Sequence, residues 1–332
     1  MDRDEWLAQV REPIIEPERP ICDPHHHLWD NERSRYLLDE LLADTDSGHN
    51  IVSTVFVECM AMYRAGGPEF LRPVGETEFV NGVAAMSASG GYGNMRACAG
   101  IVSFADLTLG KAVGEVLDAH MAASGRFRGI RHAAGWDASE EVRNSHTNPP
   151  EHLLLEPAFR EGFAELGRRG LSFDAWLYHA QIPELTDLAR AFPDTIIVFD
   201  HFGGPLGIGP YEGGREEIFR KWRSDIADLA RCENVYAKLG GIFMPINGFG
   251  FHKRAVPANS DELVAAAGRY YRHAIDCFGV ERCMFESNFP VDKASCSYAV
   301  LWNAFKKLVI DASDDEKTWL FHHAAATAYR LD

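Results

Sequence analysis

Short apolar runs rich in β-branched residues recur along the chain and predict eight β-strands. Segments of helical period separate most of these runs. Between residues 156 and 170, for example, Phe159 and Phe163 fall at helical spacing. Pro157 suits a first helical position and Gly170 is placed to end the helix. The predicted strands span residues 21–25, 51–59, 97–104, 127–132, 171–178, 195–200, 235–239 and 283–287.

Nearly all-apolar strands that alternate with helices are typical of a parallel sheet buried on both faces. A count of eight favours an α/β fold with a single (β/α)8 TIM barrel and long loops after its strands. A length of 332 residues is compatible with one such barrel. An open, doubly wound sheet is the alternative, but no glycine-rich phosphate loop follows a strand. We expect an N-terminal extension at residues 1–20 and a barrel domain at residues 21–332.

The formal net charge of −16 opposes binding to phosphate backbones and to anionic lipid. We therefore expect a small-molecule substrate and no nucleic-acid or membrane partner, and an anionic substrate would need a local cationic pocket. The first twenty residues are too charged and proline-rich for a signal peptide, and no apolar run reaches about 18 residues. We expect a cytoplasmic protein, and the sequence leaves open whether it forms a homo-oligomer.

Polar side chains stand where predicted strands end. His25 and His27 share one face of the first strand, while His26 points the other way. Loops at the C-terminal ends of barrel strands converge on one cavity, so polar groups there predict an active site. Five further strands carry such groups: Arg131 and His132, His179, Asp200 and His201, Lys238, and Glu286 with Asn288.

Three loops are long and rich in glycine, proline and asparagine, at residues 133–150, 202–214 and 240–260. Long loops in compact domains often act as lids over a site. In the last of these loops, His252, Lys253 and Arg254 either supply positive potential for an anionic substrate or form a solvated charge run.

Four motifs together resemble those of the amidohydrolase superfamily. They are Asp-x-His-x-His-x-Trp at residues 23–29, Asp-His-x-Gly at residues 200–203, Lys-Leu-x-Gly from residue 238, and FESNFPVD at residues 285–292. More narrowly, the chain resembles the branch of lactonases and pyrone-dicarboxylate hydrolases, from residue 21 nearly to the end. The resemblance implies a hydrolase of small organic acids built on a (β/α)8 barrel.

The resemblance also implies roles for individual residues. His25, His27 and His201 match the strand-one pair and the strand-six histidine, and these three would be the ligands if a metal such as zinc is bound. Arg131 matches an arginine that can grip a substrate carboxylate, and His179 lies where relatives carry a strand-five ligand. The other residues expected to bind the substrate are His132 and Lys238.

One position departs from the family pattern. Relatives usually place an aspartate in the strand-eight motif as the general base, and this chain has Asn288 there. A neutral amide cannot take a proton from water near pH 7, so another group must do so. The candidates are Glu286, Asp292 and His201. Glu286 has the parity of Asn288 one layer deeper, where burial would raise its pKa, but it could instead pair structurally with Lys238.

The sequence-based hypothesis is hydrolysis of a lactone, or of a similar C–O bond, in a small carboxylate-bearing substrate. The histidines would act either through one divalent metal, such as zinc, or without a metal. Two alternatives stay open. A non-oxidative decarboxylase of aromatic or unsaturated acids can use the same barrel, although such enzymes generally retain the strand-eight aspartate. The other alternative is a ligand-binding barrel that has lost catalysis.

Overall fold

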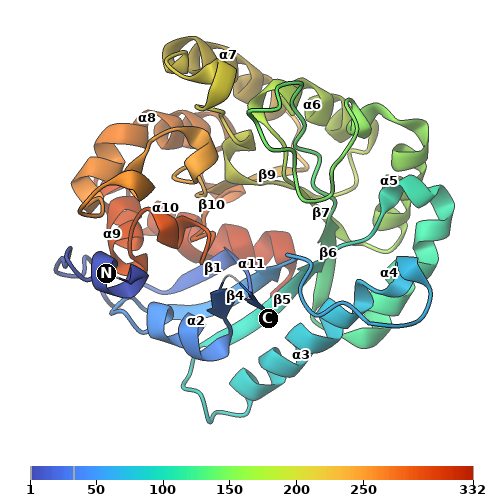
Figure 1. Cartoon of the computed structure of the whole chain (residues 1–332), viewed down its shortest axis with the longest axis horizontal. Helices are drawn as coiled ribbons and strands as arrows, with labels where there is room; N and C mark the ends of the chain where they lie inside the picture. Colours follow the sequence, from blue (N-terminus) through green and yellow to red (C-terminus); the bar gives the residue numbers. More distant parts are fainter. Residues whose placement is uncertain (1, 33, 332) are drawn as a thin grey trace.

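The computed structural model describes residues 2–32 and 34–331 and contains an eight-stranded parallel sheet curled into a nearly closed barrel (Figure 1). The strands neighbour one another in the order β1-β4-β5-β6-β7-β8-β9-β10. All eight predicted strands are present, which confirms the (β/α)8 fold. Their bounds are β1 Ile21–His26, β4 Ile51–Val57, β5 Arg96–Ser103, β6 Phe127–Arg131, β7 Ser172–Ala175, β8 Ile197–Phe199, β9 Val235–Leu239 and β10 Cys283–Phe285.

The first and last strands of the barrel meet just beyond the end of β10. The backbone N–H of His27 donates to the carbonyl oxygen of Phe289 at 2.8 Å, and the N–H of Asn288 donates to that of His25 at 2.9 Å. Deeper in the seam, the N–H of Ser287 donates to Asp23 Oδ1 at 2.9 Å. An open sheet would leave its outer strands far apart, so the alternative of a doubly wound fold is wrong.

Helices surround the barrel as an outer ring (Figure 1). The predicted helix near residues 156–170 is α5, which buries Phe159 and Phe163 against the strands, and Gly170 follows it with φ of 63°. A short hairpin of β2 (Trp29–Asn31) and β3 (Ser34–Tyr36) follows β1. The helices are α1 Arg3–Leu7, α2 Leu38–Thr45, α3 Val74–Ala88, α4 Val113–Ala123, α5 Pro157–Arg168, α6 Ile182–Ala191, α7 Arg215–Leu229, α8 Ser260–Phe278, α9 Tyr298–Leu308, α10 Asp314–Thr318 and α11 Ala324–Tyr329.

Helix α11 covers one end of the barrel. Its small residues and Tyr329 pack against interior side chains that include Val55, Val102 and Val198. The Tyr329 hydroxyl donates to Asp174 Oδ2 inside the barrel at 2.6 Å. Because this end is filled by apolar side chains, access to the interior is left to the opposite end, where the strands finish.

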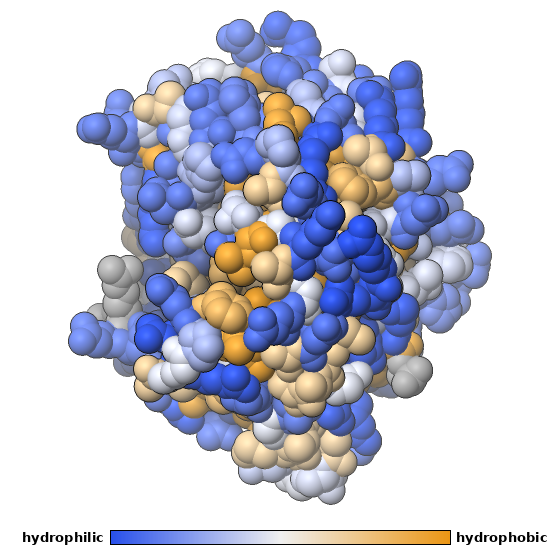
Figure 2. Space-filling view, turned by 90° about the vertical axis from the view of Figure 1, so that its right-hand side faces the viewer, coloured by the Kyte–Doolittle hydropathy of each residue, from blue (hydrophilic) through white to orange (hydrophobic). Residues whose placement is uncertain are grey.

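None of the described helices is both long enough and apolar enough to cross a bilayer. On the flank formed by α4 and α5, apolar residues lie in small groups among hydrophilic ones (Figure 2). Scattered apolar residues of this kind are normal on a folded protein.

Candidate active site

The end of β1 directs two histidines into the barrel and one out of it. His25 and His27 face inwards with ring centroids 5.0 Å apart, and His25 is completely buried. His26 points outwards, where its Nε2 lies 2.8 Å from the hydroxyl of Thr54. This alternation follows from strand geometry, in which successive side chains point to opposite faces.

Glu286 links the histidines of two strands that lie far apart in the sequence. Nδ1 of His201 donates to Glu286 Oε1 at 2.6 Å, and Nδ1 of His25 lies 2.8 Å from Glu286 Oε2. The two imidazole rings lie 4.4 Å apart. A carboxylate that accepts from Nδ1–H fixes the ring and leaves Nε2 with its lone pair. Glu286 is thus placed to orient both imidazoles.

Two glycines of the motif at the end of β9 permit this close packing. A Cβ atom on Gly241 would come 2.2 Å from His201 Nδ1, and one on Gly240 would come 2.2 Å from the carbonyl oxygen of Glu286. Atoms cannot approach so closely, so any side chain at either place would displace its neighbour. Backbone conformation is unusual here too, since His201 adopts φ of 52° and Asn288 adopts φ of 55°. Left-handed residues other than glycine are uncommon and cluster at functional sites.

Below the histidines, a buried lysine is paired with two aspartates. Lys238 Nζ lies 2.6 Å from Asp174 Oδ2 and 3.2 Å from Asp200 Oδ1, and all three side chains are completely buried. Burial opposes the charge of Lys238, but the two carboxylates outweigh it and raise the pKa of the lysine. Burial also raises the pKa of Asp174 to about 6, against the influence of Lys238. Lys238, predicted to bind substrate, therefore serves as the counter-ion of buried carboxyl groups.

The surroundings keep the strand-one histidines neutral. Burial, followed by the positive charge of Lys238, lowers the pKa of His25 well below its ordinary value. Burial and the charge of Arg131 do the same for the pKa of His27. His27 Nδ1 donates to the carbonyl oxygen of Val57 at 2.8 Å, which leaves its Nε2 with a lone pair. Neutral imidazoles of this kind can act as metal ligands or as hydrogen-bond partners of a substrate.

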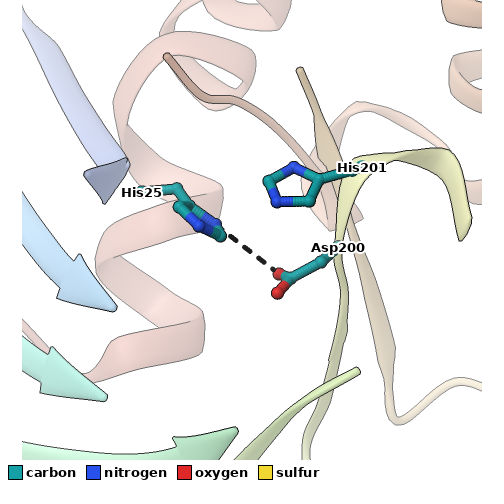
Figure 3. Close-up of side chains that lie close together, drawn as sticks. All are labelled: His25, Asp200 and His201. Carbon is teal, nitrogen blue, oxygen red and sulfur yellow. Dashed lines mark ion pairs between the residues drawn. The ribbon is translucent and has the colours of Figure 1, made fainter. Parts of the chain in front are cut away.

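One group of side chains meets the requirements of a metal site. Ligand atoms of His25, Asp200 and His201 all lie within 4.8 Å of one another, and the three side chains converge from β1 and the end of β8 (Figure 3). The oxygens of Asp200 lie 3.2 Å from Lys238 Nζ and 3.6 Å from Arg131 Nη1. Imidazole nitrogens and a carboxylate oxygen are the ligands that zinc takes in proteins. The chemistry of this donor set, which brings in Asp200 beside two of the histidines that the sequence predicted, therefore fits a zinc-like metal.

Arg131 is held by a carboxylate at the end of the neighbouring strand β4. Its Nε donates to Glu58 Oε1 at 2.7 Å and its Nη2 donates to the carbonyl oxygen of Glu58 at 2.7 Å. Only Nη1 faces the histidines, 3.4 Å from His25 Nε2 and 3.6 Å from Asp200 Oδ2. Two of the three nitrogens are thus engaged, which leaves Nη1 alone to contact the substrate carboxylate that the sequence assigned to Arg131.

The second oxygen of Glu58 binds a histidine from the long loop after β6. His146 Nε2 donates to Glu58 Oε2 at 3.0 Å, and 24% of the His146 side chain is exposed. Burial opposes ionisation of Glu58, but Arg131 and His146 outweigh it and lower the pKa of this carboxyl to about 2. Glu58 is therefore a carboxylate at neutral pH, fixed between a guanidinium and an imidazole.

A cavity of about 590 Å³ adjoins this cluster through two of its wall residues. Its walls include Trp176, whose ring lies 5.0 Å from that of His201, and His146, which is bonded to Glu58. Two basic side chains, Arg143 and Lys253, come to it from the loops after β6 and β9. A cavity of this size holds a small organic molecule. His252 also lines the cavity, whereas Arg254, named with it in the sequence, forms an ion pair with Glu262.

Two residues predicted to bind the substrate, His132 and His179, lie outside this cluster. His132 follows the last residue of β6, and its ring packs 5.2 Å from that of Phe104 and 5.6 Å from that of Phe159, a residue of the helix ring. His179 follows β7 by four residues, and its Nδ1 accepts from the backbone N–H of Leu206 at 3.3 Å. His132 has the outward parity expected after the inward Arg131, and His179 lies in a segment where strand parity no longer applies.

The strand-eight asparagine lies beside a buried acid. Asn288 Nδ2 lies 3.5 Å from Asp292 Oδ2, and Asp292 is completely buried. Burial, followed by the charge of Glu286, raises the pKa of Asp292 well above its ordinary value. A carboxyl group held in its neutral form is a poor acceptor for a proton from water.

Sequence reasoning missed three residues that the structure brings to the site: Glu58, His146 and Trp176. Glu58 could have been found, because it ends the second predicted strand in the same way that Arg131 ends the fourth. Trp176 has the strand parity of Asp174, which faces the interior. Nothing in the sequence distinguishes His146 from the other polar residues of its loop.

Comparison with known proteins identifies the family to which the chain belongs. The amidohydrolase family model matches residues 22–331. The uncharacterized protein y4mH of Sinorhizobium fredii is 35% identical over 333 residues, which cover 94% of this chain and 98% of that protein. An L-fucono-1,5-lactonase of Burkholderia ambifaria is 27% identical over 238 residues, covering 70% of this chain and 71% of the lactonase.

The fold has solved counterparts. An amidohydrolase of Burkholderia multivorans, crystallised with bound HEPES, superposes with a TM-score of 0.72 at 21% sequence identity. The superposition covers 94% of this chain and 99% of that one. The same Burkholderia protein was also solved in a crystal form with bound zinc.

Proposed function

We propose that this chain, which belongs to the lactonase-like branch of the amidohydrolase superfamily, hydrolyses lactones. The proposed substrate is a small molecule that contains a lactone ring and carries a carboxylate. The chain is an enzyme of the hydrolase class. The single observation that carries the proposal is the convergence of His25, Asp200 and His201, with Glu286 against both imidazoles. Opening a lactone needs a polarised carbonyl, an activated water and a proton for the departing alkoxide.

The donor set supports a metal-assisted form of this reaction. His25, Asp200 and His201 would hold the ion. A bound zinc ion supplies Lewis acidity towards the carbonyl and lowers the pKa of a bound water. Arg131 Nη1 faces the same space and can donate a hydrogen bond to a substrate oxygen. Zinc is also the metal in one crystal form of the Burkholderia multivorans relative, so it is the first metal to test.

The cavity walls favour a substrate that has both an anionic group and an apolar part. Arg143 and Lys253 supply positive charge, and neither forms an ion pair among the described residues. Trp176, Tyr178 and Ile246 supply an apolar wall. A net charge of −16 repels anions at long range, so this local cationic lining is what an anionic substrate requires.

A panel of five- and six-membered lactones, with and without a carboxylate, tests the proposal. We expect turnover of at least one carboxylate-bearing lactone and a much lower kcat/KM for its neutral analogue. Release of carbon dioxide from aromatic or unsaturated acids, with no lactone opened, would contradict the proposal in favour of a decarboxylase.

Zinc binding has a test that does not depend on activity. A ligand that binds only the folded state stabilises it by about 2.7 kcal/mol when present at 100 times its Kd. Zinc should therefore raise the Tm of the wild-type protein, and Asp200→Asn should reduce the rise. An equal rise in both proteins would place the metal elsewhere.

A further inference from the structure

His146 is held rigidly, although it lies in a long loop. On one side of it, the N–H of Ser145 donates to the carbonyl oxygen of Gly135 at 2.8 Å. On the other side, the hydroxyl of Thr147 donates to the carbonyl oxygen of Ala133 at 2.6 Å. Both bonds tie the loop back to the segment that directly follows β6. The imidazole is therefore positioned by the barrel itself, as a group that takes part in chemistry must be.

The orientation of the ring leaves one nitrogen available. Nε2 donates to Glu58 Oε2, and Nδ1 has no hydrogen-bond partner among the described residues. His146 lines the cavity whose walls include Trp176 and also the neighbouring cavity formed by its own loop. A carboxylate that accepts from one ring nitrogen fixes the tautomer and stabilises the imidazolium that forms when the other nitrogen takes a proton.

Resting on the proposed function, we propose that His146, oriented by Glu58, is the general base and acid of lactone hydrolysis in this protein. His146 Nδ1 takes a proton from water while the water oxygen bonds to the carbonyl carbon of the lactone. The same proton then passes to the ring oxygen as its bond to the carbonyl carbon breaks, which gives a hydroxy acid. One water is consumed and His146 returns to its neutral form.

The other candidate bases are placed less well for this task. Glu286 has one oxygen in a hydrogen bond with His201 and the other beside His25, and its side chain is completely buried. Asp292 is also completely buried and lies against the amide of Asn288. His146 is the partly exposed member of the group, and it lines the cavity that also contacts Trp176. It can take over the function that relatives assign to the strand-eight aspartate.

Charged groups on several elements act on His146. Glu58 at the end of β4 contacts it directly, and Arg131 on β6 lies behind Glu58. His132 follows β6 and interacts electrostatically with His146. Arg143 stands on the same loop and lines the same cavity. Of these groups, Glu58 is the one that contacts the ring directly and orients it.

A pair of histidine variants on neighbouring parts of the chain tests the proposal. His152 also pairs with a glutamate, since its Nδ1 lies 2.8 Å from Glu184 Oε1, but its side chain is 61% exposed and does not line the cavity. We expect His146→Gln to lower kcat/KM on the best lactone about 10²-fold or more, a typical loss for a missing acid–base group. We expect His152→Gln to change it less than twofold.

The pH profile separates a proton-transfer role from a structural one. His146→Gln should lose the acid limb of the kcat/KM profile that the wild type shows. Glu58→Gln should lower kcat/KM as well, because the imidazole loses the carboxylate that orients it. Because His146 is partly exposed, its variant should fold, and equal wild-type and variant Tm values would verify this.

The possible failures are distinguishable. If the wild type opens no lactone, the proposed function fails and this inference fails with it. If the wild type opens lactones and His146→Gln keeps both its rate and its acid limb, lactone hydrolysis stands and only the role of His146 is overturned.

Discussion

His25 at the floor of the site and His146 at its rim are both imidazoles beside a glutamate, yet their surroundings differ. His25 is completely buried, lies 2.8 Å from Glu286 and 3.2 Å from Lys238 Nζ, and is kept neutral by burial and by that lysine. His146 is partly exposed, and its glutamate is the charged group in direct contact with it. Buried neutral imidazoles suit holding a metal or a carbonyl in place. A rim imidazole with access to water suits moving protons.

Replacing the floor histidine of β8 should produce the largest change. His201→Ala removes the imidazole that Glu286 orients and one candidate metal ligand, so kcat/KM should fall about 10³-fold, the upper range for loss of one group that stabilises the transition state. His120→Ala is the matched control, because that buried ring stacks on Phe127 and does not line the cavity. It should keep its kcat/KM while the midpoint of urea unfolding falls. Equal losses of activity in the two variants would contradict the distinction between a histidine of the site and a histidine that only packs.

Removing the buried lysine should destabilise the floor of the site. Lys238→Met leaves Asp174 and Asp200 without their cation, and breaking a buried ion pair in this way typically costs about 3–5 kcal/mol. The exposed pair of Lys221 and Asp225 on α7 is the control, and Lys221→Met should cost about 0.3–0.5 kcal/mol. Free energies of unfolding in urea measure both, and similar values would contradict the assignment of Lys238.

A second glutamate near the rim makes stability depend on pH. Burial and the neighbouring Glu58 raise the pKa of Glu76 to about 8 from an ordinary 4.5, and its Oε1 accepts from the N–H groups of Cys59 and Ala61. An acid whose pKa is raised on folding stabilises the fold at low pH, and that contribution is lost as the pH rises from 4.5 to 8.

The variant Glu76→Gln keeps an acceptor oxygen and has no charge to bury. We expect the free energy of unfolding of the wild type, minus that of the variant, to fall as the pH rises from 4.5 to 8. Above pH 8 this difference should stay constant. Urea unfolding at a series of pH values measures the difference. A constant difference across that window would show that Glu76 ionises normally.

The smallest effect is expected at the outer wall of the cavity. Arg143→Gln should raise KM for a carboxylate-bearing lactone about tenfold, equivalent to about 1.4 kcal/mol, and leave KM for a neutral lactone unchanged. Arg254, which pairs with Glu262 outside the cavity, is the control position. Steady-state kinetics on both substrates distinguishes charge recognition from a general effect on the loop.

Two-residue periodicity predicted side-chain direction in the strands and for the residue directly after several of them. The eight strands and the inward direction of His25, His27 and Glu286 follow from apolar runs and this periodicity, whereas His201 directly follows the inward Asp200 and adopts φ of 52°. His132 follows the inward Arg131 and points outwards, and His179 lies in a loop segment four residues beyond β7. In such segments side-chain direction depends on loop conformation, which local pattern does not encode.

The rim could not be predicted for a different reason. Glu58 and His146 are 88 residues apart, and their contact depends on how a long loop folds back over β6. Loop paths of this kind are set by tertiary hydrogen bonds, such as the one from Thr147 to Ala133. The sequence indicated that the loop was unusual but did not identify which of its residues reaches the cavity.

The narrow space beside His201 has a consequence for how this site can evolve or be redesigned. Because a methyl group on Gly241 would overlap the imidazole, a side chain at this position is tolerated only together with a change at His201. A mutant library that randomises positions 240 and 241 alone should return almost exclusively glycine among its active members. Diversity is better introduced in the loops, where backbone and side chains have room to adjust.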